Sequence, residues 1–263
     1  MKRRGDLRVV VGMIFILLGA APAFAADPSG SLSTSVDYSK GDYGTGENTT
    51  ILSVPFMLGV TPIDRLTLSL TVPYIRQTTQ TVFVTGGGVA KRQGRERQLS
   101  RTEEGLGDIL MEGEYVLLGE QLTSPEVAGS LKIKLPTADE DRGLGTGEFD
   151  ETIGVGFSKT FLERLGLHLD LGYTFIGSPP GTDFRNSFSW STGAAYLVAQ
   201  PISVFAFLDG STAIARDQKN PLEFRFGTEY EPAKAVSLTG SLGVGLSDGS
   251  PDHSISGRVA FPF

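Results

Sequence analysis

The segment Leu165-Gly166-Leu167-His168-Leu169-Asp170-Leu171-Gly172-Tyr173-Thr174-Phe175 decides the fold. Every odd-numbered residue in it is aliphatic or aromatic, and every even-numbered residue is small or polar. Successive side chains of an extended strand point to opposite faces, so this strand has one wholly apolar face and one wet face. Soluble strands seldom alternate so regularly over this length, whereas membrane β-barrels place lipid on one face and a polar lumen on the other.

Alternation of this kind recurs along nearly the whole chain and predicts an all-β protein, a transmembrane antiparallel β-barrel of about 12 strands. The predicted strands cover residues 31–38, 50–60, 66–75, 107–118, 126–136, 151–160, 164–176, 187–198, 202–212, 222–231, 235–246 and 254–263. The phase of strand 202–212 is ambiguous, because Val204-Phe205-Ala206-Phe207-Leu208 is continuously apolar. That strand can have lipid on one side and a greasy or plugged lumen on the other.

The connections between these strands alternate in length. The short ones fall at 61–65, 119–125, 161–163, 199–201 and 232–234. The intervening ones are mostly longer, notably 76–106 and 137–150. Outer-membrane barrels have short periplasmic turns and longer external loops, so this assignment puts both termini in the periplasm.

The first 25 residues have the pattern of a secretory signal peptide. A basic start precedes the apolar stretch 9–21, and Ala23-Phe24-Ala25 supplies a small-x-small cleavage site. An uncleaved membrane anchor is the alternative, but the apolar stretch is shorter than the roughly 20 residues that span a bilayer. We therefore expect a cleaved signal peptide at 1–25, a barrel at 26–263 and export to the bacterial outer membrane.

The last predicted strand has the features of an assembly signal. Ile255, Gly257, Val259, Phe261 and Phe263 share one face, and the sequence stops on Phe263. Barrels of this class end in an amphipathic strand with a terminal aromatic residue, which the barrel assembly machinery is thought to recognise. Phe261 and Phe263 are therefore the predicted assembly signal.

The composition narrows the classes of function. The chain has no cysteine, which excludes disulfides and thiolate metal sites. Residues 1–25 hold four of the 23 Lys and Arg and one of the 30 Asp and Glu, so the remainder has 19 basic and 29 acidic residues and a net charge of −10. This acidity argues against nucleic acid as a partner. No segment after residue 25 approaches 18 consecutive apolar residues, which excludes a helical membrane span. We expect no cofactor and no metal.

Strand phase directs a set of charged and polar side chains into the lumen. These lumen and selectivity candidates are Asp108, Glu112, Glu114, Lys132, Lys134, His168, Asp170, Glu223, Arg225, Glu229 and Arg258. With a turn near 121–122, Glu112 falls opposite Lys132, and Asp108 falls near Lys134, as favourable pairs of opposite charge. Two interpretations stay open: ion pairs that hold a plugged lumen, or a selectivity lining for a permeating solute.

Opposed charges in the lumen predict low conductance and weak ion selectivity. We expect the replacement of both Lys132 and Lys134 by Ala to shift selectivity toward cations. The same change should destabilise the barrel only modestly, because lumen water can solvate the freed carboxylates.

Support for catalysis is weak, and we predict no enzyme activity. The two histidines are His168 and His253, and neither has the serine or paired acids that an outer-membrane phospholipase or an Asp/His protease needs. The glycines of 143–147 precede no helix pattern, so they do not form a phosphate cradle. The acidic run 139–141 lacks the spacing of a calcium loop.

The connection 76–106 carries a basic run in a chain that is acidic overall. Its members are Lys91, Arg92, Arg95, Arg97 and Arg101. Such a run is usually a solvated segment, but on the external side it faces lipopolysaccharide, whose phosphates suit Arg. These five residues are the candidates for lipopolysaccharide contact.

Four short motifs carry a family resemblance. They are Val72-Pro73-Tyr74, Gly105-Leu106-Gly107-Asp108, Lys132-Ile133-Lys134-Leu135-Pro136-Thr137 and Leu144-Gly145-Thr146-Gly147. Their order resembles the outer-membrane family named after the meta-pathway of phenol degradation, over most of the chain after residue 25. Family members often have Gly after the Pro-Thr pair, where this chain has Ala138. The resemblance implies a transporter of hydrophobic or aromatic compounds, a role attributed to the family largely from gene association.

These patterns together predict one twelve-stranded outer-membrane barrel that acts as a passive channel for small hydrophobic or aromatic solutes. Eight-stranded barrels are filled by side chains and those of sixteen or more strands hold aqueous channels, so twelve strands predict a narrow, partly obstructed lumen. Small inward residues leave room on two strands: Ser189, Ser191, Gly193, Ser237, Thr239, Ser241 and Gly243. The alternative is a structural or adhesive barrel that acts through its external loops. The expected partners are outer-membrane lipid, lipopolysaccharide, the barrel assembly machinery and a small-molecule solute.

Overall fold

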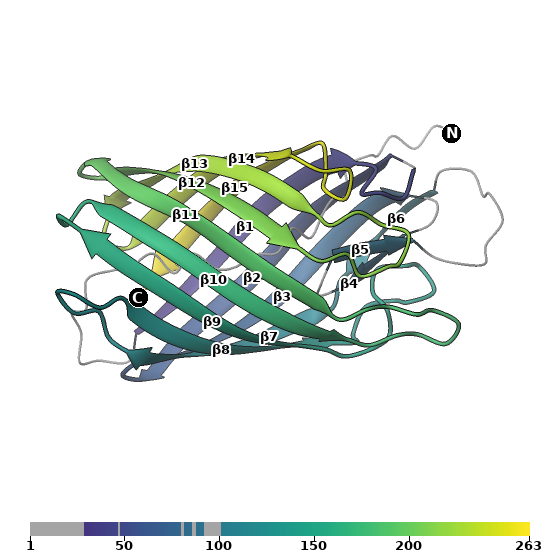
Figure 1. Ribbon diagram of the computed structural model, residues 1–263, viewed down its shortest axis with the longest axis horizontal. Coiled ribbons are helices and arrows are strands. Elements are labelled where there is room, and N and C mark those ends of the chain that lie inside the picture. Colours follow the sequence, from purple (N-terminus) through teal and green to yellow (C-terminus); the bar gives the residue numbers. More distant parts are fainter. Residues whose placement is uncertain (1–28, 47, 80–81, 86–87, 92–100) are drawn as a thin grey trace.

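The computed structural model describes residues 29–46, 48–79, 82–85, 88–91 and 101–263, and of residues 79, 82–85, 88–91 and 101 it describes the backbone alone. Regular structure in this part of the chain is all β (Figure 1). The strands are β1 (Ser29–Gly41), β2 (Thr49–Ile63), β3 (Leu66–Thr79), β4 (Val82–Thr85), β5 (Gly88–Lys91), β6 (Arg101–Leu106), β7 (Ile109–Leu118), β8 (Glu126–Leu135), β9 (Asp150–Phe161), β10 (Leu165–Ile176), β11 (Ser187–Ala199), β12 (Ile202–Ser211), β13 (Leu222–Ala233), β14 (Val236–Gly245) and β15 (His253–Pro262). Within the described residues, no helix is long and apolar enough to cross a membrane.

The large sheet closes on itself as an antiparallel barrel. Its strands pair in chain order, and β1 completes the ring by pairing with both β2 and β15. Past the end of β15, the amide of Gly30 donates to the carbonyl of Phe263 at 2.7 Å, and Phe263 returns the bond at 2.8 Å. Closure pairs the edges of the sheet, as spanning a membrane with strands requires.

The long strand β3 pairs with two strands in turn. Its first part lies beside β7, with Leu66 opposite Tyr115, and its second part lies beside β6, with Tyr74 opposite Leu106. Only residues 107–108 separate β6 from β7, so these two strands form one barrel strand interrupted by a bulge. Counted in this way, the barrel wall has the twelve strands that the alternation predicts, and the predicted fold is confirmed.

The predicted loop 76–106 is partly strand. β3 continues to Thr79, β6 begins at Arg101, and β4 and β5 form a separate hairpin between them. Residues 76–79 and 101–104 are polar on both faces, so the hydrophobic period ends while the backbone pairing continues. The prediction was wrong here because alternation reports which face is apolar, and not where strands are paired.

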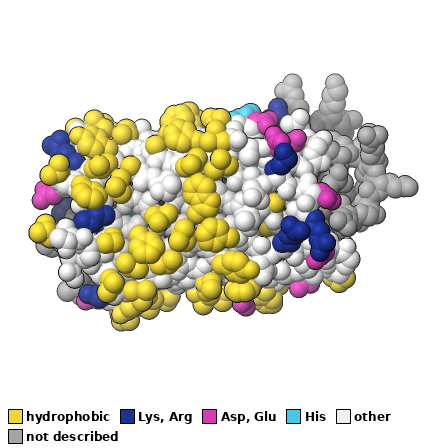
Figure 2. Space-filling view, viewed as in Figure 1, with side chains coloured by type: hydrophobic (Ala, Val, Ile, Leu, Met, Phe, Trp, Pro, Cys, Tyr) yellow, Lys and Arg dark blue, Asp and Glu magenta, His cyan; other side chains and the backbone are white. Residues whose placement is uncertain are grey.

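The outer face of the barrel is apolar along its middle. On β3, Leu68, Leu70 and Tyr74 are exposed on the outside, whereas Thr71 is buried on the inside. Figure 2 shows hydrophobic side chains over much of the visible wall, with charged side chains gathered toward the two ends. Several outward aromatic residues stand where strands end: Tyr115, Phe161, Tyr196, Tyr230 and Phe261. An apolar band with aromatic rims is the surface that a barrel presents to lipid.

Burial fixes the phase of β12. Phe205 and Phe207 are 8% and 2% exposed and point into the barrel, whereas Val204 is exposed on the outside. The middle of this strand is therefore apolar on both faces, and its two inner rings are packed against neighbouring residues, with little surface exposed to the lumen.

The two ends of the barrel differ (Figure 1). Tight connections at 64–65, 119–125, 162–164, 200–201 and 234–235 share one end, the short-turn end, with residue 263. The other connections lie at the opposite, long-loop end, so the predicted alternation of connection lengths is confirmed. In the turn between β9 and β10, Leu162 and Glu163 have φ of 51° and 56°, which matches the primed turns of tight hairpins.

Candidate functional site: the lumen and its long-loop mouth

The eleven predicted lumen residues all stand at inward-facing positions of the barrel. They come from β7 (Glu112, Glu114), β8 (Lys132, Lys134), β10 (His168, Asp170), β13 (Glu223, Arg225, Glu229), β15 (Arg258) and the bulge before β7 (Asp108). The two-residue period of the strands brings them to one side of the wall. Their part in solute selectivity stays a prediction.

The two ion pairs expected between β7 and β8 are present. Lys132 Nζ lies 3.4 Å from Glu112 Oε2, and Lys134 Nζ lies 3.1 Å from Asp108 Oδ2. The side chains of the first pair are 22% and 17% exposed, whereas those of the second are 5% and 6% exposed. Lys132 therefore lines the lumen, and Lys134 is buried.

The aromatic side chains of β12 form an apolar patch in the lumen. The ring of Phe207 covers Gly193 and the ring of Phe205 covers Gly227, each at a place where a Cβ would lie 2.5 Å from the ring. The ring of His168 stands 5.9 Å from that of Phe207. The two glycines thus let aromatic rings lie against the barrel wall.

A guanidinium group lies over this patch. Arg225 stands with its Cζ 5.4 Å from the centre of the Phe207 ring, in cation–π range. Asp209 holds it there, because Arg225 Nε and Nη2 donate to its two carboxylate oxygens at 3.1 and 3.3 Å. Ser191 also donates to Asp209, at 2.6 Å. The charge of Arg225 is therefore neutralised locally.

Small hydroxyl side chains line the wall around the β1–β15 seam. Ser35 and Ser256 both donate to Asp37. Arg258 Nη2 donates to Ser33 Oγ at 3.2 Å. Together with the inward Ser, Thr and Gly residues of β11 and β14, this wall carries short side chains and polar groups.

Sequence reasoning misses five inward carboxylates: Asp37, Glu103, Glu126, Asp150 and Asp209. Glu103 lies in the segment predicted as a loop. The alternation of strand 31–38 could have identified Asp37. Asp150 precedes the predicted start of its strand, and Asp209 lies on the strand of ambiguous phase. With the six acidic residues among the predicted ones, the described inward positions of the strands and the bulge carry eleven carboxylates against four Lys and Arg side chains. The lumen is therefore more acidic than the sequence analysis expects.

The connection between β8 and β9, residues 136–149, folds across the long-loop mouth, and we call it the lid loop. Its Leu144 is 2% exposed and packs in a buried cluster with Tyr43, Ile51 and Ile75. Gln77 Nε2 on β3 donates to the carbonyl of Gly143 at 2.8 Å. The lid loop therefore reaches from β8 and β9 past β7 to contact inward side chains of β2 and β3.

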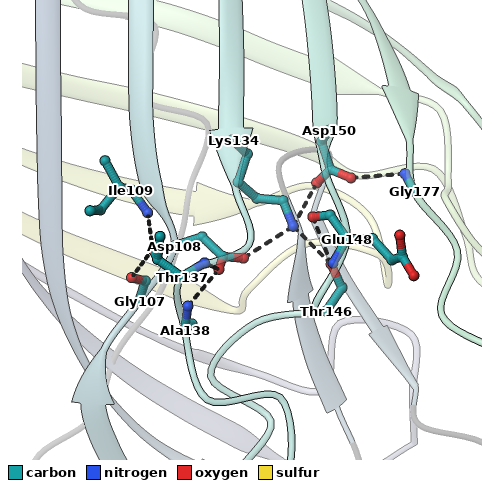
Figure 3. A network of polar contacts seen from close by, with 10 residues as sticks. All are labelled: Gly107, Asp108, Ile109, Lys134, Thr137, Ala138, Thr146, Glu148, Asp150 and Gly177. Carbon is teal, nitrogen blue, oxygen red and sulfur yellow. Dashed lines mark hydrogen bonds and ion pairs between the residues drawn. The ribbon is translucent and has the colours of Figure 1, made fainter.

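A buried ammonium group lies at the base of the lid loop (Figure 3). Lys134 Nζ is 3.1 Å from Asp108 Oδ2, 3.1 Å from Asp150 Oδ2 and 2.8 Å from Thr146 Oγ1. These side chains come from the bulge, β8, β9 and the lid loop, and all four residues are at most 6% exposed. An ammonium group has three N–H donors, so three acceptors satisfy it fully.

The carboxylates of this network also bind backbone amides. Asp108 Oδ1 accepts hydrogen bonds from the amides of Thr137 and Ala138 at 3.0 and 2.9 Å, at the start of the lid loop. Asp150 Oδ1 accepts one from the amide of Gly177 at 3.0 Å, in the connection between β10 and β11. The network therefore holds two loops of the mouth.

Other connections meet around the same mouth. Gln218 Nε2, between β12 and β13, donates to the carbonyl of Tyr43 at 3.2 Å. The amide of Arg185, between β10 and β11, donates to the carbonyl of Ile214 at 2.8 Å. In the described residues the loops thus contact one another around the mouth as well as the barrel wall.

The residues considered for other chemistry do not assemble into a site. His168 lies in the lumen, whereas His253 lies on the outer face with its ring 6.2 Å from that of Tyr38. In the part of the chain that the structure describes, no group of three or more His, Asp or Glu side chains is placed to hold a metal ion. The acidic run 139–141 belongs to the lid loop.

Most side chains of the basic run between β3 and β6 lie outside the described part of the structure. Arg92, Arg95 and Arg97 lie outside the described residues, and Lys91 and Arg101 are described by backbone alone. Contact with lipopolysaccharide therefore stays a prediction.

The fold is that of outer membrane channels and porins. An outer membrane channel from Pseudomonas putida F1 is 17% identical, with a TM-score of 0.68 over 93% of this chain and 98% of that one. The KdgM porin in complex with disordered oligogalacturonate is 8% identical, with a TM-score of 0.57 over 89% and 99%. The NanC porin is 10% identical, with a TM-score of 0.55 over 88% and 98%. No curated protein matches the chain by sequence.

A family model matches residues 80–263, which is well over half of the chain. The match includes the motifs at 105–108, 132–137 and 144–147, so the family resemblance seen in the sequence is confirmed. The chain belongs to the family described as "Putative MetA-pathway of phenol degradation".

Proposed function

We propose that the protein is a passive channel of the bacterial outer membrane that admits small hydrophobic or aromatic solutes. The observation that carries this proposal is a closed barrel with an apolar outer face and a lumen lined by short polar side chains. A wall of this kind offers a solute a path through the membrane that avoids contact with lipid. The family description and the channels of similar fold support the same role.

The lumen favours uncharged solutes over anionic ones. Eleven inward carboxylates against four Lys and Arg side chains repel an organic anion. A neutral aromatic molecule such as a phenol meets no charge penalty. A benzoate of similar size carries a charge that the lumen disfavours.

The topology that we propose places the short-turn end in the periplasm and the long-loop end outside the cell. It assigns residues 1–25 to a cleaved signal peptide and the terminal aromatic residues to recognition by the assembly machinery. The basic run that includes Lys91 would then meet lipopolysaccharide phosphates. Protease cleavage within 92–100 on intact cells supports this placement, and cleavage only after disruption of the outer membrane contradicts it.

Solute entry into proteoliposomes tests the function. We expect vesicles that contain the folded protein to take up phenol faster than empty vesicles after subtraction of passive leak, with a smaller gain for benzoate. Boiled protein, which migrates differently on gels when unfolded, serves as the control. Equal uptake in the presence and absence of folded protein would contradict a channel.

A structural or adhesive barrel is the second candidate, and the lid loop is the observation that favours it. The lid loop turns inward at the long-loop end, where Leu144 packs in a buried cluster with Ile51 and Ile75 of the wall. A barrel that never opens would show neither current in planar bilayers nor solute entry, which separates the two functions.

A further inference from the structure

Three sequence motifs that are separate in the chain meet at one buried charge. Asp108 comes from the motif at 105–108, Lys134 and Thr137 come from the motif at 132–137, and Thr146 comes from the motif at 144–147 (Figure 3). The proposed path for solute does not need a buried ammonium group at this place.

The glycines of these motifs allow the segments of the network to pack closely together. A Cβ on Gly145 would lie 2.6 Å from Asp108 Oδ2 and 2.8 Å from the Cβ of Ala138. A Cβ on Gly107 would lie 2.4 Å from the Cδ1 of Ile75. Only residues without a side chain let the bulge, the lid loop and β3 come this close.

The bulge depends on the lid loop for its hydrogen bonds. Ile109 donates its amide to Thr137 Oγ1 at 2.9 Å, and Thr137 Oγ1 donates to the carbonyl of Gly107. Asp108 in turn binds the amides at the start of the lid loop. The wall and the lid loop thus satisfy each other's backbone groups, which couples the position of one to the other.

The charge of Lys134 is what keeps the two carboxylates together. Asp108 and Asp150 each place one oxygen 3.1 Å from the same nitrogen, and both residues are buried. Without the ammonium group, two buried carboxylates would face each other with no counter-charge. Movement of the lid loop away from the wall would let water reach them, so loss of the charge favours an open lid loop.

We propose that Asp108, Lys134 and Asp150 form a latch that holds the lid loop across the mouth, and that the channel conducts freely when the latch is released. This inference rests on the proposed channel function. A second ion pair also joins the lid loop to the wall: Arg142 lies 3.0 Å from Glu103, and this pair is more exposed. The latch is the buried one, so its loss has the larger effect.

Thiol labelling tests the latch without any need for transport. The chain has no cysteine, so Leu144→Cys places a single thiol in the buried lid cluster. In refolded full-length protein, we expect a membrane-impermeant maleimide to react at least about tenfold faster when Lys134→Met is added, because local opening exposes the thiol. Equal rates with and without Lys134→Met would overturn the latch.

Lys132→Met is the matched control. It removes a lysine whose ion pair, with Glu112 of β7, lies on the same face of β8 but outside the network around Lys134, so labelling of Leu144→Cys should stay at its original rate. If the labelling rate rises equally in both variants, the cause is the loss of any lumen lysine, and the latch is contradicted. Gel mobility before and after boiling establishes that each variant is folded.

Thr146→Val provides a milder variant if Lys134→Met fails to fold. It removes the 2.8 Å bond from Lys134 and a 3.3 Å bond from the Glu148 amide but leaves both ion pairs, so labelling should rise by a smaller factor. No rise in this folded variant would then overturn the latch.

Currents in planar bilayers complete the test. We expect Lys134→Met to raise the open probability several-fold over the unsubstituted protein and over Lys132→Met. Faster labelling with no current in any of the proteins would contradict the channel function, whereas normal currents with unchanged labelling would contradict the latch.

Discussion

Lys132 and Lys134 stand two residues apart on the same face of β8, but their surroundings differ. The sequence predicts the partner of each, because strand register follows from the turn between β7 and β8. It does not reveal that the lid loop covers Lys134, since that contact depends on how residues 136–149 fold back. Asp108 is 6% exposed, so water can solvate its freed carboxylate only if the lid loop moves, which the sequence-based expectation of a modest loss did not consider.

Single replacements of the two lysines should have unequal costs. We expect Lys134→Ala to lower the free energy of unfolding by about 3 kcal/mol, as for a broken buried ion pair that can partly relax by opening of the lid loop. Lys132→Ala should cost less than about 1 kcal/mol, because its carboxylate partner reaches the lumen. Urea unfolding in lipid vesicles measures both values, and equal costs would contradict the burial of Lys134.

Replacement of Gly145 by Ala tests the close approach of the lid loop to the wall. The added methyl group overlaps Asp108 and Ala138, so we expect the free energy of unfolding to fall by about 1–3 kcal/mol. The thiol of Leu144→Cys should also be labelled faster. Gly240→Ala is the control, because a Cβ at this outward site meets nothing within 4 Å. Similar losses in the two variants would mean that the lid loop has room to adjust.

At the scale of the elements, hydrophobic alternation identifies strands wherever one face meets lipid. It finds all twelve barrel strands, including the segment 165–175 in β10, because lipid enforces the two-residue period. It misses β6 and the end of β3, where both faces are polar. It leaves the phase of β12 open. The rings of Phe205 and Phe207 lie against the inner wall because Gly193 and Gly227, on the neighbouring strands, leave space for them. The sequence of β12 alone does not reveal this space.

The turn between β9 and β10 offers a test of element geometry. Glu163 has φ of 56°, a conformation that costs a residue with a Cβ about 1 kcal/mol relative to glycine. We expect Glu163→Gly to raise the free energy of unfolding by about that amount, whereas Glu163→Ala, which keeps the Cβ, should not. A loss of stability in Glu163→Gly would mean that the side chain itself stabilises the turn.

At the scale of the whole molecule, the charge of the lumen decides which ions pass. The sequence analysis expects weak ion selectivity from opposed charges, but five further inward carboxylates leave a clear acidic excess. We therefore predict cation selectivity, measured as the reversal potential in a salt gradient. The double replacement Glu114→Gln with Asp170→Asn should reduce it, since both side chains point into the lumen. An anion-selective protein would contradict this charge distribution.

The central claim is that the barrel is a channel and that the lid loop closes it. Ile75→Cys and Leu144→Cys place two thiols in one buried cluster, one on the wall and one on the lid loop of a chain without cysteine. A short, reducible bifunctional reagent can bridge them, and single-channel current is then recorded before and after reduction. We predict that the bridged protein carries no current and that reduction restores it. Equal current in the bridged and reduced states would contradict the claim.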